Sequence, residues 1–257
     1  MGGKGGGSVG TISFEGRVGI VTGAGRELGL GRAYALELAR RGAAVVVNDP
    51  LGVDDPRGPA VDRVVEEIRA AGGRAVASTA SVATEEGAGQ IVATALDAFG
   101  TVDVLVHNAG AWRNAPFSEM TEELIDPVID VHLKGGFFLA RAAWDVMLAK
   151  GFGRIVLTSS PAGFFGRVEG ANYAAAKTGL YGLCRALSLE GAGRGVLTNC
   201  VVPIANTMSD DERGAAGRVL VPELAAVSEA LRGRDEPARV AALVAFLASD
   251  RCTASGE

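Results

Sequence analysis

Short apolar runs alternate with amphipathic stretches along almost the whole of this chain. Strands that are buried on both faces of a sheet read as continuous apolar runs, and the amphipathic stretches between them pack as helices on those faces. The pattern therefore predicts an α/β domain with a doubly wound parallel sheet. The expected strands are Val18–Thr22, Ala43–Asn48, Ala75–Ser78, Val102–His107, Arg154–Ser159 and Thr198–Val202. The expected helices are Arg32–Arg41, Val61–Ala71, Glu85–Phe99, Leu124–Lys150, Tyr173–Gly191 and Pro237–Ser249.

The length of 257 residues fits a single domain of this kind, which we expect to occupy residues 13–257. Residues 1–12 are rich in glycine and are expected to form a flexible tail. Residues 204–236 are polar and charged with weak periodicity, so they interrupt the alternation. We interpret them as a mobile lid, with an ordinary surface loop as the alternative.

Charge and cysteine content exclude several classes of function. The chain has 25 basic against 30 acidic residues, which gives no electrostatic footprint for a nucleic-acid backbone. Cys184, Cys200 and Cys252 lack paired spacing, and with only two histidines they argue against a disulfide framework or a metal site. No apolar run resembles a signal peptide or a membrane span. We expect a cytoplasmic protein that binds neither nucleic acid nor membrane.

Tyr173 and Lys177 lie one helical turn apart, so both side chains can project from the same face of one helix. A tyrosine in water has a pKa of ~10, and a fixed positive charge nearby favours the phenolate and lowers that pKa. Ser160 closes the expected strand upstream of this helix. A strand end opposite a helix turn predicts an acid and base site. For the pair alone, an ordinary helix face with a long lysine is the alternative.

The first expected strand runs into a glycine-rich turn, residues 22–31, which leads directly into a helix. Glycines let the backbone approach a pyrophosphate, whose charge the helix N-terminus stabilises. Asp49 follows the second expected strand, where a carboxylate can accept the ribose hydroxyls and repel a 2′-phosphate. This combination favours NAD over NADP. Arg26 is a weak argument for NADP, because it can either meet a 2′-phosphate or remain solvated.

Together with Asn108-Ala109-Gly110 after the fourth expected strand, these motifs resemble the short-chain dehydrogenase/reductase family over residues 17–250. The resemblance implies a Rossmann-like fold and an NAD-dependent oxidoreductase that acts on a CH–OH group. Within the family, residues 33–35, 45–49, 131–135 and 171–173 are most similar to the (3R)-hydroxyacyl-CoA dehydrogenase domain of peroxisomal multifunctional enzyme type 2 and its bacterial relatives.

The resemblance also implies roles for individual residues. Tyr173 would exchange a proton with the substrate oxygen, Ser160 would hydrogen-bond the same oxygen, and Lys177 would support Tyr173 and hold the nicotinamide ribose. His132 stands where the family usually has an asparagine that takes part in a proton path. It could relay a proton in the same way or have a purely structural role. The expected cofactor contacts are Gly23, Gly25, Arg26, Gly29, Leu30, Gly31, Asp49, Ser81, Val82, Asn108, Ala109, Gly110, Tyr173, Lys177, Pro203 and Thr207.

Besides His132, the chain departs from the family pattern at other places, including Ile204 where a glycine usually follows the proline. The glycine-rich turn is two residues longer, with Glu27 and Leu28 as the extra pair, and a carboxylate there is unfavourable unless it points to solvent. Ala80 stands where the family often has an aspartate that meets the adenine. The segment after residue 250 is too short and polar for a seventh strand, which predicts an exposed sheet edge.

We expect the substrate to be a secondary alcohol or ketone, either a 3-hydroxyacyl thioester or a steroid-like molecule. The alternative is a non-catalytic nucleotide-binding module with a regulatory or scaffolding role. Family members usually form tetramers or dimers through their long helices, here near Leu124–Lys150 and Tyr173–Gly191, so the resemblance implies a homo-oligomer. Apolar residues on these two stretches are equally compatible with packing against the sheet.

Overall fold

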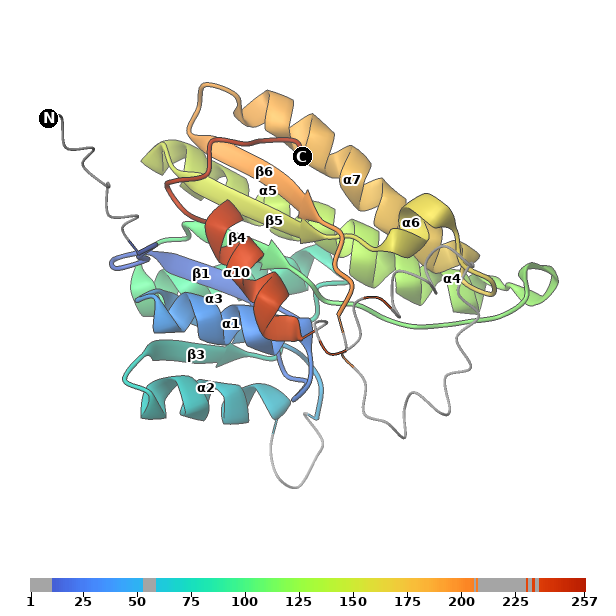
Figure 1. Ribbon diagram of the computed structural model, residues 1–257, viewed down its shortest axis with the longest axis horizontal. Coiled ribbons are helices and arrows are strands. Elements are labelled where there is room, and N and C mark those ends of the chain that lie inside the picture. Colours follow the sequence, from blue (N-terminus) through green and yellow to red (C-terminus); the bar gives the residue numbers. More distant parts are fainter. Residues whose placement is uncertain (1–10, 53–58, 206, 208–229, 231–232, 234–235) are drawn as a thin grey trace, which may run out of the picture.

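The computed structural model of the chain describes residues 11–52, 59–205, 207, 230, 233 and 236–257 (Figure 1). The predicted tail at 1–12 and the predicted lid at 204–236 fall mostly outside these residues. In the part of the chain that is described, no helix is long and apolar enough to cross a membrane.

Six parallel strands form one sheet in the order β3-β2-β1-β4-β5-β6. This order confirms the predicted doubly wound sheet. The order reverses between β1 and β4, and ligands of such folds bind beyond the carboxyl ends of the strands at this point. The strands are β1 Val18–Thr22, β2 Ala44–Asn48, β3 Arg74–Ser78, β4 Val104–His107, β5 Gly153–Thr158 and β6 Val196–Val201.

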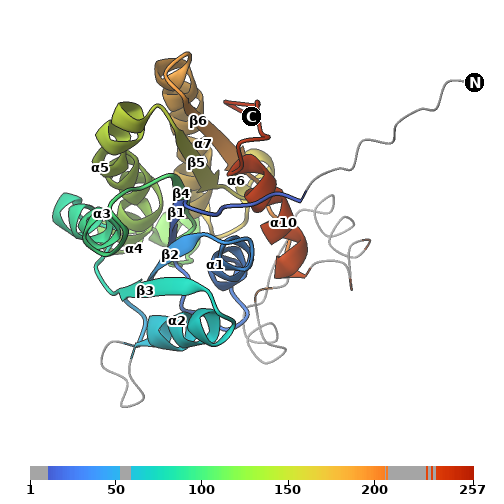
Figure 2. The same cartoon turned by 90° about the vertical axis from the view of Figure 1, so that its left-hand side faces the viewer.

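Helices cover both faces of the sheet, as continuous apolar strands require (Figure 2). Two separate buried clusters result, one on each face. Trp144, Leu180 and Leu183 belong to the second cluster, so these apolar side chains of the long helices pack toward the sheet. One face carries α1 Leu30–Arg40, α2 Ala60–Ala70 and α10 Pro237–Leu247; the other carries α3 Glu85–Phe99, α5 Gly135–Lys150 and α7 Ala171–Gly191.

The predicted single helix Leu124–Lys150 is wrong in one respect, because the structure divides this stretch. It consists of α4 Glu122–Ile129, the π-helix η2 Asp130–Lys134 and then α5. Hydrophobic periodicity does not report such a change of hydrogen-bonding pattern, since the chain remains helical throughout. Two short helices were also not predicted, η1 Phe117–Glu119 and α6 Pro161–Phe165.

The start of β6 was also predicted too late. β6 begins at Val196, which pairs with Gly153 at the start of β5. The two residues before the predicted start, Thr198, belong to β6 because they pair with β5. The local sequence does not reveal this pairing.

The last residues of the chain run along the outer edge of β6 (Figure 1). The Gly256 N–H donates to the Thr198 carbonyl, and the Cys200 N–H donates to the Glu257 carbonyl, each at 2.7 Å. The Asn199 amide donates to the Ala254 carbonyl at 2.9 Å. The edge that we expected to be exposed for lack of a seventh strand is therefore partly covered by this segment.

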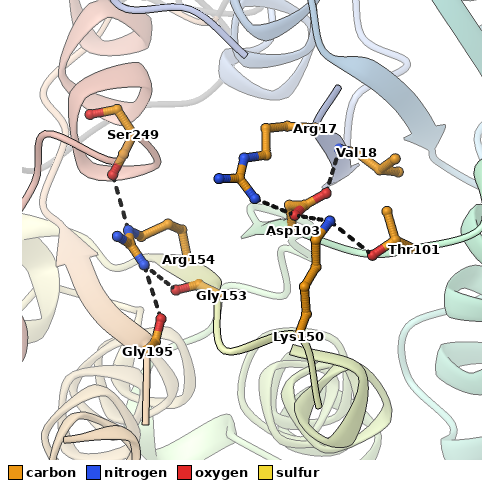
Figure 3. A network of polar contacts seen from close by, with 9 residues as sticks. All are labelled: Arg17, Val18, Thr101, Asp103, Lys150, Gly153, Arg154, Gly195 and Ser249. Atoms are coloured by element: carbon orange, nitrogen blue, oxygen red, sulfur yellow. Dashed lines mark hydrogen bonds and ion pairs between the residues drawn. The ribbon is translucent and has the colours of Figure 1, made fainter. Parts of the chain in front are cut away.

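Asp103 is a buried carboxylate at the amino end of the sheet (Figure 3). Its Oδ1 pairs with Arg17 at 3.0 Å and with Lys150 at 2.5 Å, while its Oδ2 accepts the Val18 N–H at 2.9 Å. The Arg17 and Lys150 side chains are 31% and 34% exposed, so water still solvates part of their charge. One carboxylate thus joins the starts of β1 and β4 to the end of α5.

Arg154 occupies the same end of the sheet and is buried (Figure 3). Its guanidinium donates to three main-chain carbonyls, those of Gly153, Gly195 and Ser249. The Phe152 ring lies 3.7 Å from the Arg17 guanidinium carbon and 4.2 Å from that of Arg154. The polar and cationic groups that close this end are therefore far from the carboxyl ends of the strands.

We predict that Asp103→Asn lowers the free energy of unfolding by about 3 kcal/mol, because it removes the charge that the two cations and the Val18 N–H share. Asp145→Asn is the matched control. Asp145 pairs with Arg141 on the surface, where both side chains are at least 70% exposed, and its loss costs about 0.5 kcal/mol or less. Denaturant titration of both variants measures the difference. Equal stabilities would contradict the anchoring role of Asp103.

Candidate active site

The glycine-rich turn after β1 is shaped for close approach of another backbone or a ligand. Gly23 has φ +64°, and a Cβ there would lie 2.7 Å from the Ala109 Cα. A Cβ on Gly31 would collide with the Gly23 carbonyl. The N-cap of α1 is Gly29, and no side chain caps the helix. The first N–H groups of α1 therefore suit a pyrophosphate, and the predicted dinucleotide fits this turn.

The two extra residues of this turn project away from it. Glu27 and Leu28 are exposed, Leu28 to 51%. The Gly29 N–H donates to the Arg26 carbonyl at 3.0 Å, which closes a tight turn around them. The Glu27 carboxylate consequently lies in solvent, where its repulsion of a pyrophosphate is screened.

Asp49 lies directly beside the glycine-rich turn. Its Oδ2 accepts the Gly25 N–H at 3.0 Å, and its Oδ1 accepts the Leu51 N–H at 2.9 Å. A Cβ on Gly25 would lie 2.9 Å from the Ala60 Cβ and 3.1 Å from the Asp49 Cβ, so glycine makes room for both neighbours. An ionised carboxylate accepts about four hydrogen bonds, which leaves Asp49 with capacity for ribose hydroxyls.

The Thr22 hydroxyl joins the end of β1 to the end of β4. Its oxygen accepts the N–H groups of Asn108 and Ala109, both at 3.1 Å. With both lone pairs used, the hydroxyl proton is left to donate to His107 Nδ1 at 3.3 Å. We therefore assign the tautomer of His107 that carries its proton on Nε2. That nitrogen donates to the His132 carbonyl at 2.8 Å.

His132 lies in the π-helix η2 and is buried. Its Nε2 lies 3.1 Å from the Ala111 nitrogen and 3.0 Å from the Ala111 oxygen. Its ring meets the Tyr173 ring edge-on at 5.2 Å, and its Nδ1 has no hydrogen-bond partner among the described residues. A Cβ on Gly110 would lie 2.6 Å from the His132 ring, so Gly110 makes room for the imidazole. Burial holds the pKa of His132 well below its ordinary value.

The end of β5 and the helix α7 are joined by two reciprocal hydrogen bonds. The Lys177 ammonium donates to the Thr158 carbonyl at 2.5 Å, and the Ser159 hydroxyl donates to the Lys177 carbonyl at 2.8 Å. Ser160 follows directly and caps α6, accepting the Ala162 N–H at 3.2 Å. The Lys177 nitrogen lies 5.6 Å from the centre of the Tyr173 ring. The predicted pair thus shares one helix face, next to the strand end that carries Ser160.

Burial lowers the pKa of Lys177 to about 7. A lysine at its ordinary pKa is fully protonated at neutral pH, whereas an amine near 7 takes up and releases a proton readily. The position of Lys177 against the strand end therefore makes it able to move a proton as well as to supply charge.

The remaining predicted contacts lie on neighbouring loops at the same end of the sheet. The Asn48 amide donates to the Ser78 and Ala80 carbonyls at 3.0 and 2.9 Å, which fixes the segment after β3. In that segment Val82 is buried and Ser81 is exposed. The Ser81 hydroxyl accepts the Ala83 N–H at 3.2 Å. Pro203 and Thr207 are half-buried beyond β6.

Residues 17–213 match the family model described as short chain dehydrogenase. The chain belongs to the short-chain dehydrogenase family. It is therefore an oxidoreductase that acts on CH–OH groups.

Two named proteins and one solved structure are closely similar to this chain. The peroxisomal multifunctional enzyme type 2 of Mus musculus is 44% identical over 249 residues, which are 95% of this chain but only 31% of the mouse protein. A hydroxyacyl-CoA dehydrogenase of Mycobacterium tuberculosis is 40% identical over 93% of this chain and 74% of its own length. The crystal structure of a short chain dehydrogenase from Mycobacterium avium superposes with a TM-score of 0.79, at 38% identity over 95% of this chain and 81% of that chain.

One arrangement at the site of this dehydrogenase was not predicted. The Trp112 ring stacks on the Tyr173 ring at 4.2 Å with an interplanar angle of 23°, and the Arg167 guanidinium lies 4.8 Å from the centre of the Trp112 ring. Such contacts contribute about 0.5–1.5 kcal/mol for the ring pair and about 0.5–1 kcal/mol for an exposed cation over a ring. No sequence pattern places Trp112 on Tyr173, so this contact is visible only in the structure.

His107 also escaped the sequence analysis as part of the site, and it generates a pH prediction. Burial lowers its pKa to about 4, so folded His107 stays neutral where the unfolded chain takes up a proton. Its contribution to the free energy of unfolding is thus complete above pH ~6.5 and falls by about 3 kcal/mol as the pH is lowered to ~4.

We expect His107→Gln to lower stability at pH 7 and to flatten its decline below pH 6.5, because glutamine does not titrate. Urea unfolding of parent and variant at several pH values gives the difference curve. Parallel curves over this window would contradict a buried neutral His107. Lys134→Gln is the control, since the Lys134 side chain is exposed and titrates far above this range.

Proposed function

We propose that the protein is an NAD-dependent dehydrogenase of secondary alcohols, with Tyr173 as the acid and base. The observation that carries the proposal is the pair of hydrogen bonds between the end of β5 and α7. Through Ser159 and Lys177 they hold the strand end that bears Ser160 against the helix face that bears Tyr173. A hydroxyl, a phenol and a buried amine are thereby gathered beside the strand-order reversal, where the glycine-rich turn also lies.

In the proposed reaction Tyr173 takes the proton of the substrate hydroxyl during oxidation and returns it during reduction. Ser160 hydrogen-bonds the same oxygen and stabilises the charge that develops on it. The protonated amine of Lys177 favours the anionic phenol and would hold the nicotinamide ribose. A nicotinamide cofactor in this site would supply the hydride-transfer chemistry. Trp112 and His132 both pack against the Tyr173 ring and orient it.

The choice of NAD rests on Asp49. Its carboxylate lies beside Gly25, at the end of β2, where the ribose hydroxyls of the adenosine half are bound in folds of this type. A 2′-phosphate there would meet a negative charge at short range. The glycine-rich turn, the loop with Ser81 and Val82, and the segment Asn108 to Gly110 complete the proposed cofactor site, with Pro203 and Thr207 on the nicotinamide side.

For the substrate we propose a 3-hydroxyacyl thioester or a steroid-like alcohol. The name of one relative supports the thioester, since that protein is a hydroxyacyl-CoA dehydrogenase. Exposed apolar side chains around α6 and the neighbouring loops offer a surface for an acyl chain or a fused ring; they are Trp112, Phe117, Phe164, Phe165 and Val168.

We further propose that His132 relays a proton. We also propose that the protein is cytoplasmic and that it forms a homo-oligomer, either a tetramer or a dimer.

We predict that Tyr173→Phe lowers kcat/KM for oxidation of 3-hydroxybutyryl-CoA by about 10²–10⁴-fold, because the variant keeps the ring but lacks the proton-exchanging hydroxyl. Tyr181→Phe, the same change two turns along α7, is the control and should retain the parent rate. The measurement is the rise in absorbance at 340 nm as NADH forms. A Tyr173→Phe variant as fast as the parent would exclude Tyr173 as the acid and base.

We predict that NADH binds in the micromolar range and NADPH at least about tenfold more weakly, since repulsion between Asp49 and the 2′-phosphate exceeds 1.4 kcal/mol at close range. Nicotinamide fluorescence titration of the purified protein measures both. Asp49→Asn should bring the dissociation constants for NADPH and NADH closer together, because the amide still accepts a hydrogen bond but carries no charge. Glu27→Gln, in the exposed part of the glycine-rich turn, is the control and should leave the ratio of the two constants unchanged. Preference for NADPH in the parent protein would overturn Asp49 as the selector.

A further inference from the structure

Trp112 covers one face of the Tyr173 ring. The two ring centres are 4.2 Å apart with an interplanar angle of 23°. Tyr173 is 8% exposed whereas Trp112 is 42% exposed, so the indole lies between the phenol ring and solvent. On its own outer side the indole meets the Arg167 guanidinium at 4.8 Å. Phenol, indole and guanidinium therefore form three successive layers.

The segments that carry these layers are fastened to each other. The Asn172 amide donates to the Arg113 carbonyl at 2.8 Å and to the Leu124 carbonyl at 2.7 Å, so the residue before Tyr173 holds the residue after Trp112. The Ala115 N–H donates to the Glu169 carbonyl at 3.2 Å, two residues beyond Arg167.

Glu169 itself has φ +57°, in the left-handed region that side chains other than glycine rarely adopt. Such strain persists where the surroundings fix the backbone, and it is common at functional sites. Here the strained residue presents the carbonyl that holds the Trp112 segment. The segment that follows Trp112 is thus held at Arg113 by Asn172 and at Ala115 by Glu169, and these contacts fix the indole over Tyr173.

Other aromatic side chains of this region do not share this position. Among ring contacts between described residues, Tyr173 meets Trp112 and His132. Phe164 meets Tyr181 instead, and Phe117 is 82% exposed. Trp112 is therefore the large, partly accessible side chain placed directly against the ring whose hydroxyl must reach the substrate.

We propose that Trp112 is a specificity-determining residue whose indole limits the bulk of the substituents on and next to the reacting carbon. The inference rests on the proposed role of Tyr173, because the substrate oxygen must come within hydrogen-bond reach of that phenol. The phenol and the guanidinium cover the two faces of the indole, so a substrate meets its edge. A straight chain passes beside this edge, whereas a branch next to the reacting carbon or a fused ring collides with it. Trp112 thus favours straight-chain 3-hydroxyacyl substrates over branched or steroid-like ones, and Arg167 holds the indole in place.

The test compares 3-hydroxybutyryl-CoA with 3-hydroxy-2-methylbutyryl-CoA, with NAD present. Trp112→Ala opens the space over Tyr173, and the ratio of kcat/KM for the branched to the straight substrate should rise about tenfold or more, as one methyl group in a tight pocket allows. Trp112→Phe keeps a flat ring there, and its ratio should stay within about threefold of the parent. Phe246→Ala, which removes an aromatic ring of the same 42% exposure from α10, outside the proposed site, should leave the ratio unchanged.

Each outcome bears on the inference. An unchanged ratio in an active Trp112→Ala variant overturns the size limit while leaving the proposed function intact. Loss of activity toward both substrates in Trp112→Ala and Trp112→Phe alike, with the parent active, assigns Trp112 to positioning of Tyr173 and also overturns it. If the parent oxidises neither thioester, the proposed substrate class fails, and the size limit for that class fails with it.

Discussion

The buried hydroxyl of Thr22 is the contact on which the site depends. It uses both lone pairs and its proton at once, so the ends of β1 and β4 and the ring of His107 are held in one arrangement. Through His107 the same chain of hydrogen bonds reaches the main chain of His132. The turn shaped for a pyrophosphate and the segment that packs on Tyr173 are thereby connected without any intervening charge.

Much of the fold was accessible from the sequence, because parallel strands buried on both faces leave an unmistakable alternation of apolar and amphipathic stretches. The six strands and the doubly wound order follow from that pattern. The strand end at Ser160 and the helical spacing of Tyr173 and Lys177 likewise predicted a shared location, and the structure joins these elements through Ser159 and Lys177.

What escaped prediction depends on contacts between distant segments. The π-helix at Asp130–Lys134 keeps helical periodicity, so no local signal marks it. The stack of Trp112 on Tyr173 arises from hydrogen bonds of Asn172 and Glu169 to a loop about 60 residues away, and sequence spacing says nothing of such pairings. The burial of His107 was predictable from its strand, but its tautomer follows only from the bonds that Thr22 makes.

The π-helix also has an evolutionary consequence. An α-helix turns by about 100° per residue, so a turn with one residue more than usual lets α4 and α5 each present the correct face to their neighbours. Deleting one residue from 130–134 would restore regular helix but rotate α5 relative to α4 by about that angle, and its core side chains would leave the sheet. Proteins that share this packing are thus constrained to keep the number of residues between α4 and α5.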